Sequence, residues 1–175
     1  MDDQIRRIRA SEWQELRSLR LQALAEAPTA FGSTLAQEQI YPEEVWRERA
    51  LGSSSGCDRA TFVAHAGGVW IGVVTGLANQ FASASGVPLL VAMFVVAPER
   101  RRGFGVRLVD TVAAWAQECG HSQLALWVTS DNASAVALYE RCNFRFSGAI
   151  KPHSHAHGLV EKEMIRHLQE AKSCQ

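Results

Sequence analysis

The stretch Val96-Ala97-Pro98-Glu99-Arg100-Arg101-Arg102-Gly103-Phe104-Gly105 decides how this chain folds. It ends a run of apolar residues that begins at Pro88, and such a run predicts a central strand covered on both faces. Pro98 predicts a turn where that strand ends. Apolar residues at helical spacing then predict a helix over 103–119, which Gly120 terminates. The chain thus passes from a buried strand through a short basic turn into a helix.

This turn predicts a binding site for phosphate groups. The first amides of a helix lack intrahelical partners and lie at the positive end of the helix dipole. The consecutive arginines Arg100–Arg102 add guanidinium groups that bind phosphate through paired hydrogen bonds, and glycines let the backbone approach a ligand closely. The chain has no GxxxxGK[ST] run, and Leu108 holds the third glycine position of GxGxxG. Taken alone, the same arginines are also typical of a solvated turn.

The composition indicates one globular domain and excludes a charge-driven binder of nucleic acid or membranes. The chain has 175 residues, of which 47% are hydrophobic and 21% charged, and this length is typical of a single domain. It carries 18 Lys and Arg against 18 Asp and Glu, for a formal net charge of zero. Proteins that bind phosphate backbones or anionic lipid need an excess of positive charge.

The cysteines and the N-terminus predict a cytoplasmic protein. Cys57, Cys119, Cys142 and Cys174 are far apart, without CxxC or zinc spacing, so we expect free thiols in a reducing compartment. The charged N-terminal segment is unlike a signal peptide, and the longest apolar stretch, 88–97, is too short to span a bilayer.

Alternating strands and helices predict an α/β sandwich with mixed strand directions. Besides the central strand, strands are expected over Gln4–Arg9, Ala60–Ala66, Val69–Leu77, Leu124–Thr129, Phe144–Ala149 and Leu159–His167. Further helices are expected over Ser11–Ala25, from Pro42, and over Asn132–Cys142, with Ser11 as an N-cap. Gly67–Gly68 predicts a hairpin, and Ile150–Gly158 is expected to be a loop.

A second motif follows the strand 124–129, and together the two motifs resemble the GNAT superfamily of acetyl-CoA-dependent N-acetyltransferases. The first, R-x-x-G-x-G/A, is matched by Arg100, Gly103 and Gly105. The second, N-x-x-A-x-x-L-Y-x-x-x-G/N-F, is matched by Asn132, Ala135, Leu138, Tyr139, Asn143 and Phe144. The motifs occur in the expected order, separated by one helix and one strand, and the resemblance extends from about Ala60 to His167.

The resemblance implies a GNAT-type fold: a mixed, mostly antiparallel central sheet flanked by helices, with a splay between the fourth and fifth strands. It implies a single N-acetyltransferase domain over 1–175, with acceptor-side helices and loops over 11–59, an acetyl-CoA-binding core over 60–143 and a C-terminal hairpin over 144–167. The implied reaction is transfer of an acetyl group from acetyl-CoA to a primary amine, by direct attack in a ternary complex and without a metal.

The resemblance also assigns roles to residues of the two motifs. The backbone of Phe94, Val95 and Val96 would pair with the pantetheine arm, and an amide near Phe94–Val95 would polarise the thioester carbonyl. The turn would hold the pyrophosphate through the amides of Arg101, Arg102, Gly103, Phe104, Gly105 and Val106, with Arg100 beside it. Asn132 would bind the pantetheine arm, although it is also an ordinary N-cap. Tyr139 would donate a proton to the departing thiolate, although an apolar helix face also suits a core tyrosine.

Two features depart from the family pattern. The turn between Pro98 and Gly103 is one residue shorter than the common form, and Arg101 stands where glycine is usual. Trp127 holds the position, five residues before Asn132, of the usual general-base glutamate. A protonated alkylamine must lose a proton before it attacks the thioester, so Glu38 and His65 become candidate general bases. No base is needed if the amine of the acceptor has a low pKa. Trp127 could stack on the substrate, hold a cation over its ring, or simply pack.

The acceptor is left open by the sequence. The resemblance places its entrance between Phe31–Ile40 and the loop carrying His153, His155 and His157, so these histidines are expected to contact substrate or solvent rather than a metal. The acidic residues Glu26, Glu38, Glu43 and Glu44 would attract a cationic amine or form a solvated face. A small-molecule or peptide amine and a homodimer both suit the family. A non-catalytic acyl-CoA-binding or regulatory module, or transfer of another acyl group or to oxygen, is the alternative.

Overall fold

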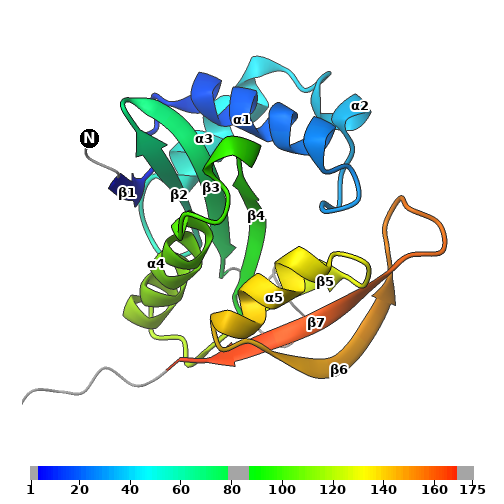
Figure 1. Cartoon of the computed structure of the whole chain (residues 1–175). Coiled ribbons are helices and arrows are strands. Elements are labelled where there is room, and N and C mark those ends of the chain that lie inside the picture. The colour runs from blue at the N-terminus through cyan, green and yellow to red at the C-terminus, as the bar shows by residue number, and fades with distance from the viewer. Residues whose placement is uncertain (1–3, 79–86, 169–175) are drawn as a thin grey trace, which may run out of the picture.

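The computed structural model describes residues 4–78 and 87–168. These residues form seven strands, five α-helices and one short 3-10 helix (Figure 1). In chain order the elements are β1 (Gln4–Arg7), α1 (Trp13–Glu26), α2 (Leu35–Glu38), α3 (Glu43–Ser53), β2 (Arg59–Ala66), β3 (Val69–Leu77), β4 (Leu89–Val95), η1 (Ala97–Glu99), α4 (Phe104–Glu118), β5 (Gln123–Thr129), α5 (Ala133–Arg141), β6 (Arg145–Pro152) and β7 (Val160–His167).

The strands form one sheet in the order β1-β2-β3-β4-β5-β7-β6. All neighbouring strands are antiparallel except β4 and β5, which are parallel. The prediction of a mixed, mostly antiparallel sheet flanked by helices is therefore confirmed. The hairpin between β2 and β3 also forms as predicted, because Gly67 and Gly68 adopt φ angles of 59° and 84° that suit a tight hairpin turn.

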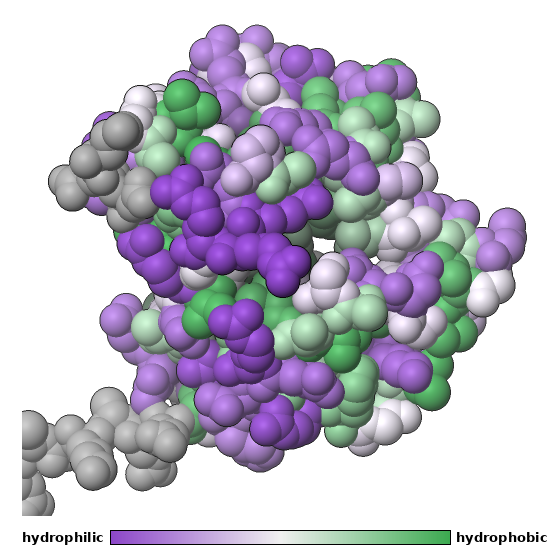
Figure 2. Space-filling model, in the orientation of Figure 1, coloured by the Kyte–Doolittle hydropathy of each residue, from purple (hydrophilic) through white to green (hydrophobic). Residues whose placement is uncertain are grey.

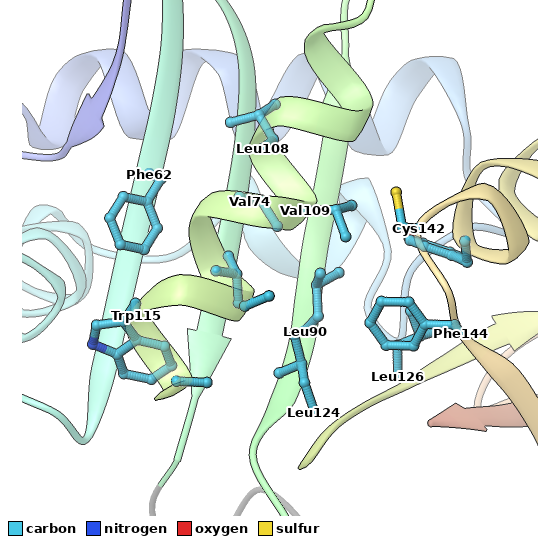
Figure 3. Packing of buried hydrophobic residues seen from close by; sticks show 14 of the residues in the cluster. Phe62, Val74, Leu90, Leu108, Val109, Trp115, Leu124, Leu126, Cys142 and Phe144 are labelled. Atoms are coloured by element: carbon cyan, nitrogen blue, oxygen red, sulfur yellow. The ribbon is translucent and has the colours of Figure 1, made fainter. Parts of the chain in front are cut away.

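Helices cover both faces of the sheet. On one face, Leu108, Val109 and Trp115 of α4 point toward the strands and pack around Val74 and Leu90 (Figure 3). On the other face, α1 buries its apolar stripe in a second cluster, whose members are Leu19, Ala23, Leu24, Phe31, Val63, Val73 and Phe94. Since β4 contributes a residue to each cluster, its expected burial on both faces is confirmed.

Local details differ from the sequence-based expectations near two helices. Helix α1 has Glu12 rather than Ser11 as its N-cap, and no side chain caps its first turn. The carboxylate of Glu12 instead accepts a hydrogen bond from the backbone amide of Arg9. The segment before Pro42, where no helix was expected, contains α2, which begins with a capping box between Thr34 and Gln37. The pattern T-x-x-Q was visible in the sequence and is typical of a helix start.

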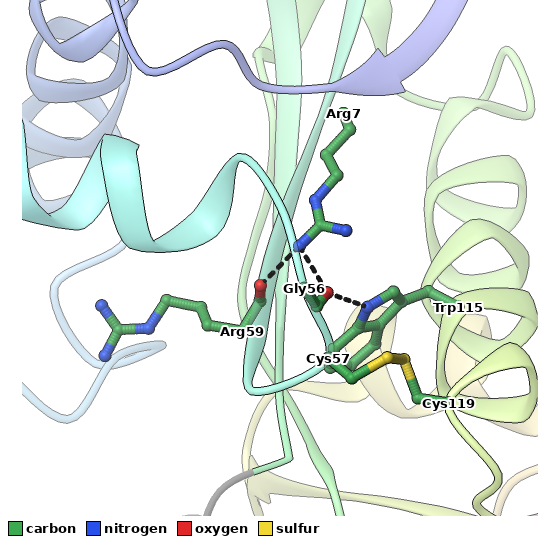
Figure 4. Close-up of a disulfide and its surroundings, with 6 residues drawn as sticks. All are labelled: Arg7, Gly56, Cys57, Arg59, Trp115 and Cys119. Carbon is green, nitrogen blue, oxygen red and sulfur yellow. Dashed lines mark hydrogen bonds between the residues drawn. A yellow bond between two sulfur atoms is a disulfide. The ribbon is translucent and has the colours of Figure 1, made fainter.

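The expectation that all cysteines are free thiols is wrong. Cys57 and Cys119 form a disulfide between the loop after α3 and the end of α4 (Figure 4). Beside it, the carbonyl of Gly56 accepts hydrogen bonds from Arg7 (2.9 Å) and Trp115 (3.3 Å), which fixes the loop against α4. Cys142 is a free, buried thiol, and Cys174 lies outside the described residues. The two partners are 62 residues apart in the chain, so no local motif announces the pairing.

Two further findings concern the length of β6 and the hydrophobicity of the helices. Strand β6 continues to Pro152, so the loop expected from Ile150 begins at His153 instead. Within residues 4–78 and 87–168, no helix is long and apolar enough to cross a membrane.

Candidate functional site

The central feature of the site is a gap between β4 and β5. In the described part of the sheet, the ladder between these strands contains one residue pair, Leu89 with Ala125. Beyond this pair the two strands diverge toward their carboxyl ends. This is the predicted splay between the fourth and fifth strands. Figure 2 shows the surface hollowed between the upper helices and α5, in the region where the two strands separate. An extended ligand can therefore enter the sheet and pair with the free edge of β4.

A β-bulge lies on β4 beside this gap. Val91 pairs with Thr75 and Phe94 pairs with Val73, so two residues, Ala92 and Met93, lie opposite one residue of β3. Ala92 has a φ angle of 55°, which is uncommon for a residue with a side chain. The bulge precedes by two residues the amides of Phe94–Val95 that were expected to polarise a carbonyl. The sequence contained no sign of it, since alanine does not favour this conformation.

The basic turn presents the uncapped end of a helix to the gap. Helix α4 begins at Phe104 after Gly103, whose φ angle is 88°, and no side chain caps it. The amides of Phe104, Gly105 and Val106 therefore lack partners within the helix and carry the positive end of its dipole. A Cβ atom on Gly105 would lie 3.2 Å from Leu138, so this glycine allows α4 and α5 to pack closely. The predicted anion-binding turn is thus built on a rigid base.

The three arginines of the turn have different environments. Arg100 donates to the carbonyl of Val95 (2.8 Å) and pairs with Glu26 of α1 (3.2 Å), so its side chain fixes the end of β4. Arg102 pairs with Glu99 of the same turn. Arg101 is exposed and has a φ angle of 65°.

Two residues of the second motif were expected to act from α5. Asn132 lies at the start of the helix, and Tyr139 lies on its buried face. Asn132 is the N-cap, and its side-chain oxygen accepts from the amide of Ala135 at 3.2 Å. Tyr139 is 7% exposed and packs edge-on against Phe144. Burial, followed by the nearby Cys142, raises the pKa of Tyr139 above its ordinary value. The phenol is therefore protonated at every physiological pH and can serve as a proton donor, but not as a base.

Trp127 lies on β5, on the face of the sheet opposite α4, and already has a cation over its ring. The ammonium of Lys151 lies 4.3 Å from the ring centroid and also pairs with Glu161 at 3.3 Å. Across the ladder, Trp127 pairs with Glu163 of β7, so the two side chains share a face. Glu163 accepts a hydrogen bond of 2.6 Å from Ser147. The sequence did not reveal this carboxylate, because its position depends on β7 lying next to β5.

The loop that follows α1 is fastened to the loop between β6 and β7. The backbone carbonyls of Thr29 and Phe31 accept hydrogen bonds from His153 (3.1 Å) and His155 (2.7 Å), and Ser154 donates to the carbonyl of Gly32 (2.9 Å). The histidines expected at the entrance thus join its two sides. Phe31 itself is buried in the cluster under α1. Across the described ranges, no group of three or more His, Cys, Asp or Glu side chains could hold a metal ion.

The two candidate bases lie away from the gap or are already paired. Glu38 is 2% exposed and accepts hydrogen bonds from Arg20 (2.8 Å) and Arg49 (2.7 Å). Although burial raises its pKa, hydrogen bonds from Arg20 and Ser33 and the nearby positive charges lower it to about 2. A carboxylate this acidic is a poor proton acceptor. His65 lies on β2, two strands from β4.

A model of the Acetyltransferase (GNAT) family matches residues 13–144 of the chain. The chain belongs to this family. Its matched region includes the basic turn, the gap between β4 and β5, and α5. A search of curated proteins finds no significant match.

Solved structures described as acetyltransferases or putative acetyltransferases share the fold over nearly the whole chain. A GNAT acetyltransferase from Streptococcus pneumoniae is similar with a TM-score of 0.79 at 20% identity, covering 96% of this chain and 100% of that one. The structure of yncA from Salmonella typhimurium with its cofactor acetyl-CoA has a TM-score of 0.76 at 16% identity, covering 100% and 99%. The ribosomal-protein-S18-alanine N-acetyltransferase of Escherichia coli has a TM-score of 0.69 at 15% identity, covering 99% of each chain.

The GNAT pattern explains the unusual conformation of Arg101. This residue stands where GNAT sequences usually carry glycine, and its φ of 65° lies in the left-handed region that glycine adopts without strain. Arg101 therefore adopts a backbone conformation that favours glycine although it carries a side chain. The exchange places a further positive charge at the turn and introduces local strain.

Proposed function

We propose that the chain transfers the acetyl group of acetyl-CoA to a primary amine by direct attack within a ternary complex. The observation that carries this proposal is the gap between β4 and β5, which opens beside the uncapped start of α4 in a GNAT chain. In this proposal, residues 11–59 carry the acceptor side and residues 60–143 bind the cosubstrate, within one N-acetyltransferase domain.

The residues of the gap suit the parts of acetyl-CoA in order. The free edge of β4 at Phe94, Val95 and Val96 pairs with the pantetheine arm, and Asn132 contacts the same arm. The amides of residues 101–106 bind the pyrophosphate, and Arg101 adds an exposed guanidinium. The bulge at Ala92 turns a backbone amide toward the thioester oxygen, which polarises the carbonyl and stabilises the charge that develops there.

Proton transfer in the proposed reaction uses residues on both sides of the gap. The amine reaches the thioester carbon as a neutral nucleophile, so an ammonium must first lose one proton. We assign that proton to Glu163, directly or through one water, because this carboxylate shares a face with Trp127. The amine then forms the amide bond and the carbon–sulfur bond breaks. Tyr139 donates its hydrogen bond and proton to the sulfur, and the proton leaving the new amide nitrogen restores the phenol.

The raised pKa of Tyr139 sets the character of this step. An ordinary thiol has a pKa of about 8.5 and an ordinary phenol one of about 10, so proton transfer to a thiolate is mildly unfavourable. Burial makes it more unfavourable in this protein. Tyr139 therefore acts mainly as a hydrogen-bond donor to the developing thiolate, and full transfer follows once the amide nitrogen gives up its proton.

The test is Tyr139→Phe, assayed with acetyl-CoA and a panel of primary amines. We expect kcat to fall about 100-fold or more, the lower end of general-acid contributions, while acetyl-CoA binds nearly as tightly as before. An unchanged kcat contradicts the role of the phenol. Isothermal titration with acetyl-CoA and with the non-reactive product coenzyme A provides the binding control.

A non-catalytic acyl-CoA-binding module is the second candidate function. It is favoured by Trp127, which holds the position of the usual general base and is covered by Lys151. The same experiment separates the two, because saturable acetyl-CoA binding without transfer to any amine supports the binding module. If Arg101→Ala loses acetyl-CoA binding, the turn is identified as part of the acetyl-CoA site, whether the protein is an enzyme or a binding module.

A further inference from the structure

A cavity of about 230 Å³ lies between the acceptor-side helices and the sheet. It is bounded by α1 and α3 on one side and by β2, β3 and β4 on the other. Its lining includes the charged side chains Arg20, Arg49, Arg59 and Glu38, and it reaches the bulge at Ala92. The cavity is therefore adjacent to the point where the proposed function places the reacting carbonyl.

The cavity is positively charged, although the acidic residues of this region suggested the opposite. Glu38 is its one acidic lining residue against three arginines, and it is shared between Arg20 and Arg49. Arg59 has no carboxylate partner within residues 4–78 and 87–168. Its guanidinium extends away from the disulfide loop in Figure 4, and its backbone carbonyl alone takes part in the contacts drawn there. The lining thus carries an excess of two positive charges.

Two buried donors at the cavity also lack a partner. The indole nitrogen of Trp46 and one terminal nitrogen of Arg20 are buried without any hydrogen bond in the described structure. Trp46 is 0% exposed, so its indole opens neither to the outer surface nor to the cavity space. A buried donor left unpaired costs about 1–3 kcal/mol, so the fold carries an energetic cost beside the cavity. Both donors lie on residues that line a positively charged cavity, and these surroundings favour an anionic occupant.

We infer that this cavity binds the carboxylate of the acceptor, so that the acceptor is a primary amine carrying a carboxylate, such as an amino acid. The inference rests on the proposed function and names its substrate class. A carboxylate matches the planar fork of a guanidinium through two parallel hydrogen bonds. With its carboxylate held by Arg59, and with Arg20 and Arg49 adding positive charge to the same cavity, the acceptor extends its amine toward Ala92.

The first test compares acceptors that differ only in charge. The kcat/KM values of γ-aminobutyrate and β-alanine are measured against those of their amides, and against aminoalkylphosphonates of the same length. We expect each carboxylate to be preferred over its amide by about 10- to 100-fold, since hydrogen bonds to charged groups contribute about 1.5–3 kcal/mol. Equal rates for acids and amides overturn the inference. A preference for phosphonates over carboxylates overturns the assignment of a carboxylate.

Arg59→Gln is the diagnostic variant, because Arg59 has no ion pair whose loss would unfold the protein. We expect the preference for acid over amide to fall about tenfold. The matched control is Arg47→Gln on α3, which removes an exposed arginine outside the cavity. The preference of Arg47→Gln for acid over amide should equal that of the unchanged protein. If both variants lose this preference equally, the assignment of Arg59 to the carboxylate is overturned.

Binding measured without catalysis separates this inference from the proposed function. Glutarate and glutaramide are titrated calorimetrically into the protein saturated with coenzyme A. If glutarate binds and Arg59→Gln weakens that binding, the cavity is supported as a carboxylate site. This holds even if no amine is acetylated, and then only the proposed function fails. Acetylation of amines with no binding of glutarate leaves the proposed function intact and overturns the inference.

Discussion

The buried carboxylate of Glu38 should make the stability of the fold depend on pH below about 5. Burial alone raises its pKa, but hydrogen bonds from Arg20 and Ser33 and the charges of Arg20 and Arg49 lower it to about 2, from an ordinary 4.5. Between these two values the unfolded chain binds the proton and the folded chain does not. The free energy of unfolding therefore rises with pH in this window and falls as the pH drops toward the folded pKa.

The magnitude follows from the size of the shift. Each pKa unit corresponds to about 1.36 kcal/mol, so the charged form of Glu38 stabilises the fold by about 3 kcal/mol above pH 5. Nearly all of this is lost at pH 2. The assay is urea unfolding followed by tryptophan fluorescence from pH 7 to pH 2, on the unchanged protein and on Glu38→Gln.

The difference in free energy of unfolding between the unchanged protein and Glu38→Gln isolates the contribution of Glu38 from those of the other acidic groups. We expect this difference to shrink by about 3 kcal/mol between pH 6 and pH 2. The control Glu43→Gln removes an exposed carboxylate from α3, and its difference should change by less than about 1 kcal/mol, as for surface ion pairs. A difference for Glu38→Gln that is constant with pH would refute the role of the arginines in holding its pKa down.

Three further predictions concern residues elsewhere in the fold. Reduction of the disulfide between Cys57 and Cys119, which closes a loop of 62 residues, should lower the free energy of unfolding by about 4 kcal/mol. Urea midpoints with and without reductant check this, and a double serine variant should not respond to reductant. Arg101→Gly should stabilise the fold by about 1 kcal/mol by relieving the left-handed strain, whereas Arg101→Ala should not, and both should bind acetyl-CoA more weakly. Glu163→Gln should lower kcat/KM about 100-fold and remove the acidic limb of its pH profile, and a profile that matches the unchanged protein would exclude Glu163 as the base.

The sequence predicts the sheet and the binding turn because each depends on local patterns. The strand before Pro98 is a continuous apolar run, the α4 residues repeat at helical spacing, and Gly103 stands where a left-handed residue begins a helix. The two motifs then supply the order of the strands around the gap, which apolar patterns alone do not determine. The predictions that hold best are those in which local preference and family pattern agree.

The features that escaped prediction depend on contacts between distant segments. The bulge at Ala92 arises from the register between β3 and β4, and alanine gives no sign of it. The position of Glu163 beside Trp127 requires β7 to insert next to β5. The charge of the acceptor side was misleading for the same reason. Glu38 counts as an acidic residue in the sequence, whereas in the fold two arginines neutralise it.

The disulfide has a mechanical consequence for the gap. It joins the loop after α3, on the proposed acceptor side, to the carboxyl end of α4, whose amino end carries the turn that we propose binds phosphate. A helix of 15 residues is about 22 Å long, so the covalent tie and the turn lie at opposite ends of one rigid rod. The helical layers on the two faces of the sheet are thereby joined covalently at Cys57. The covalent restraint therefore acts at the end of α4 farthest from the turn, and the turn itself contains no cysteine that could add a second one.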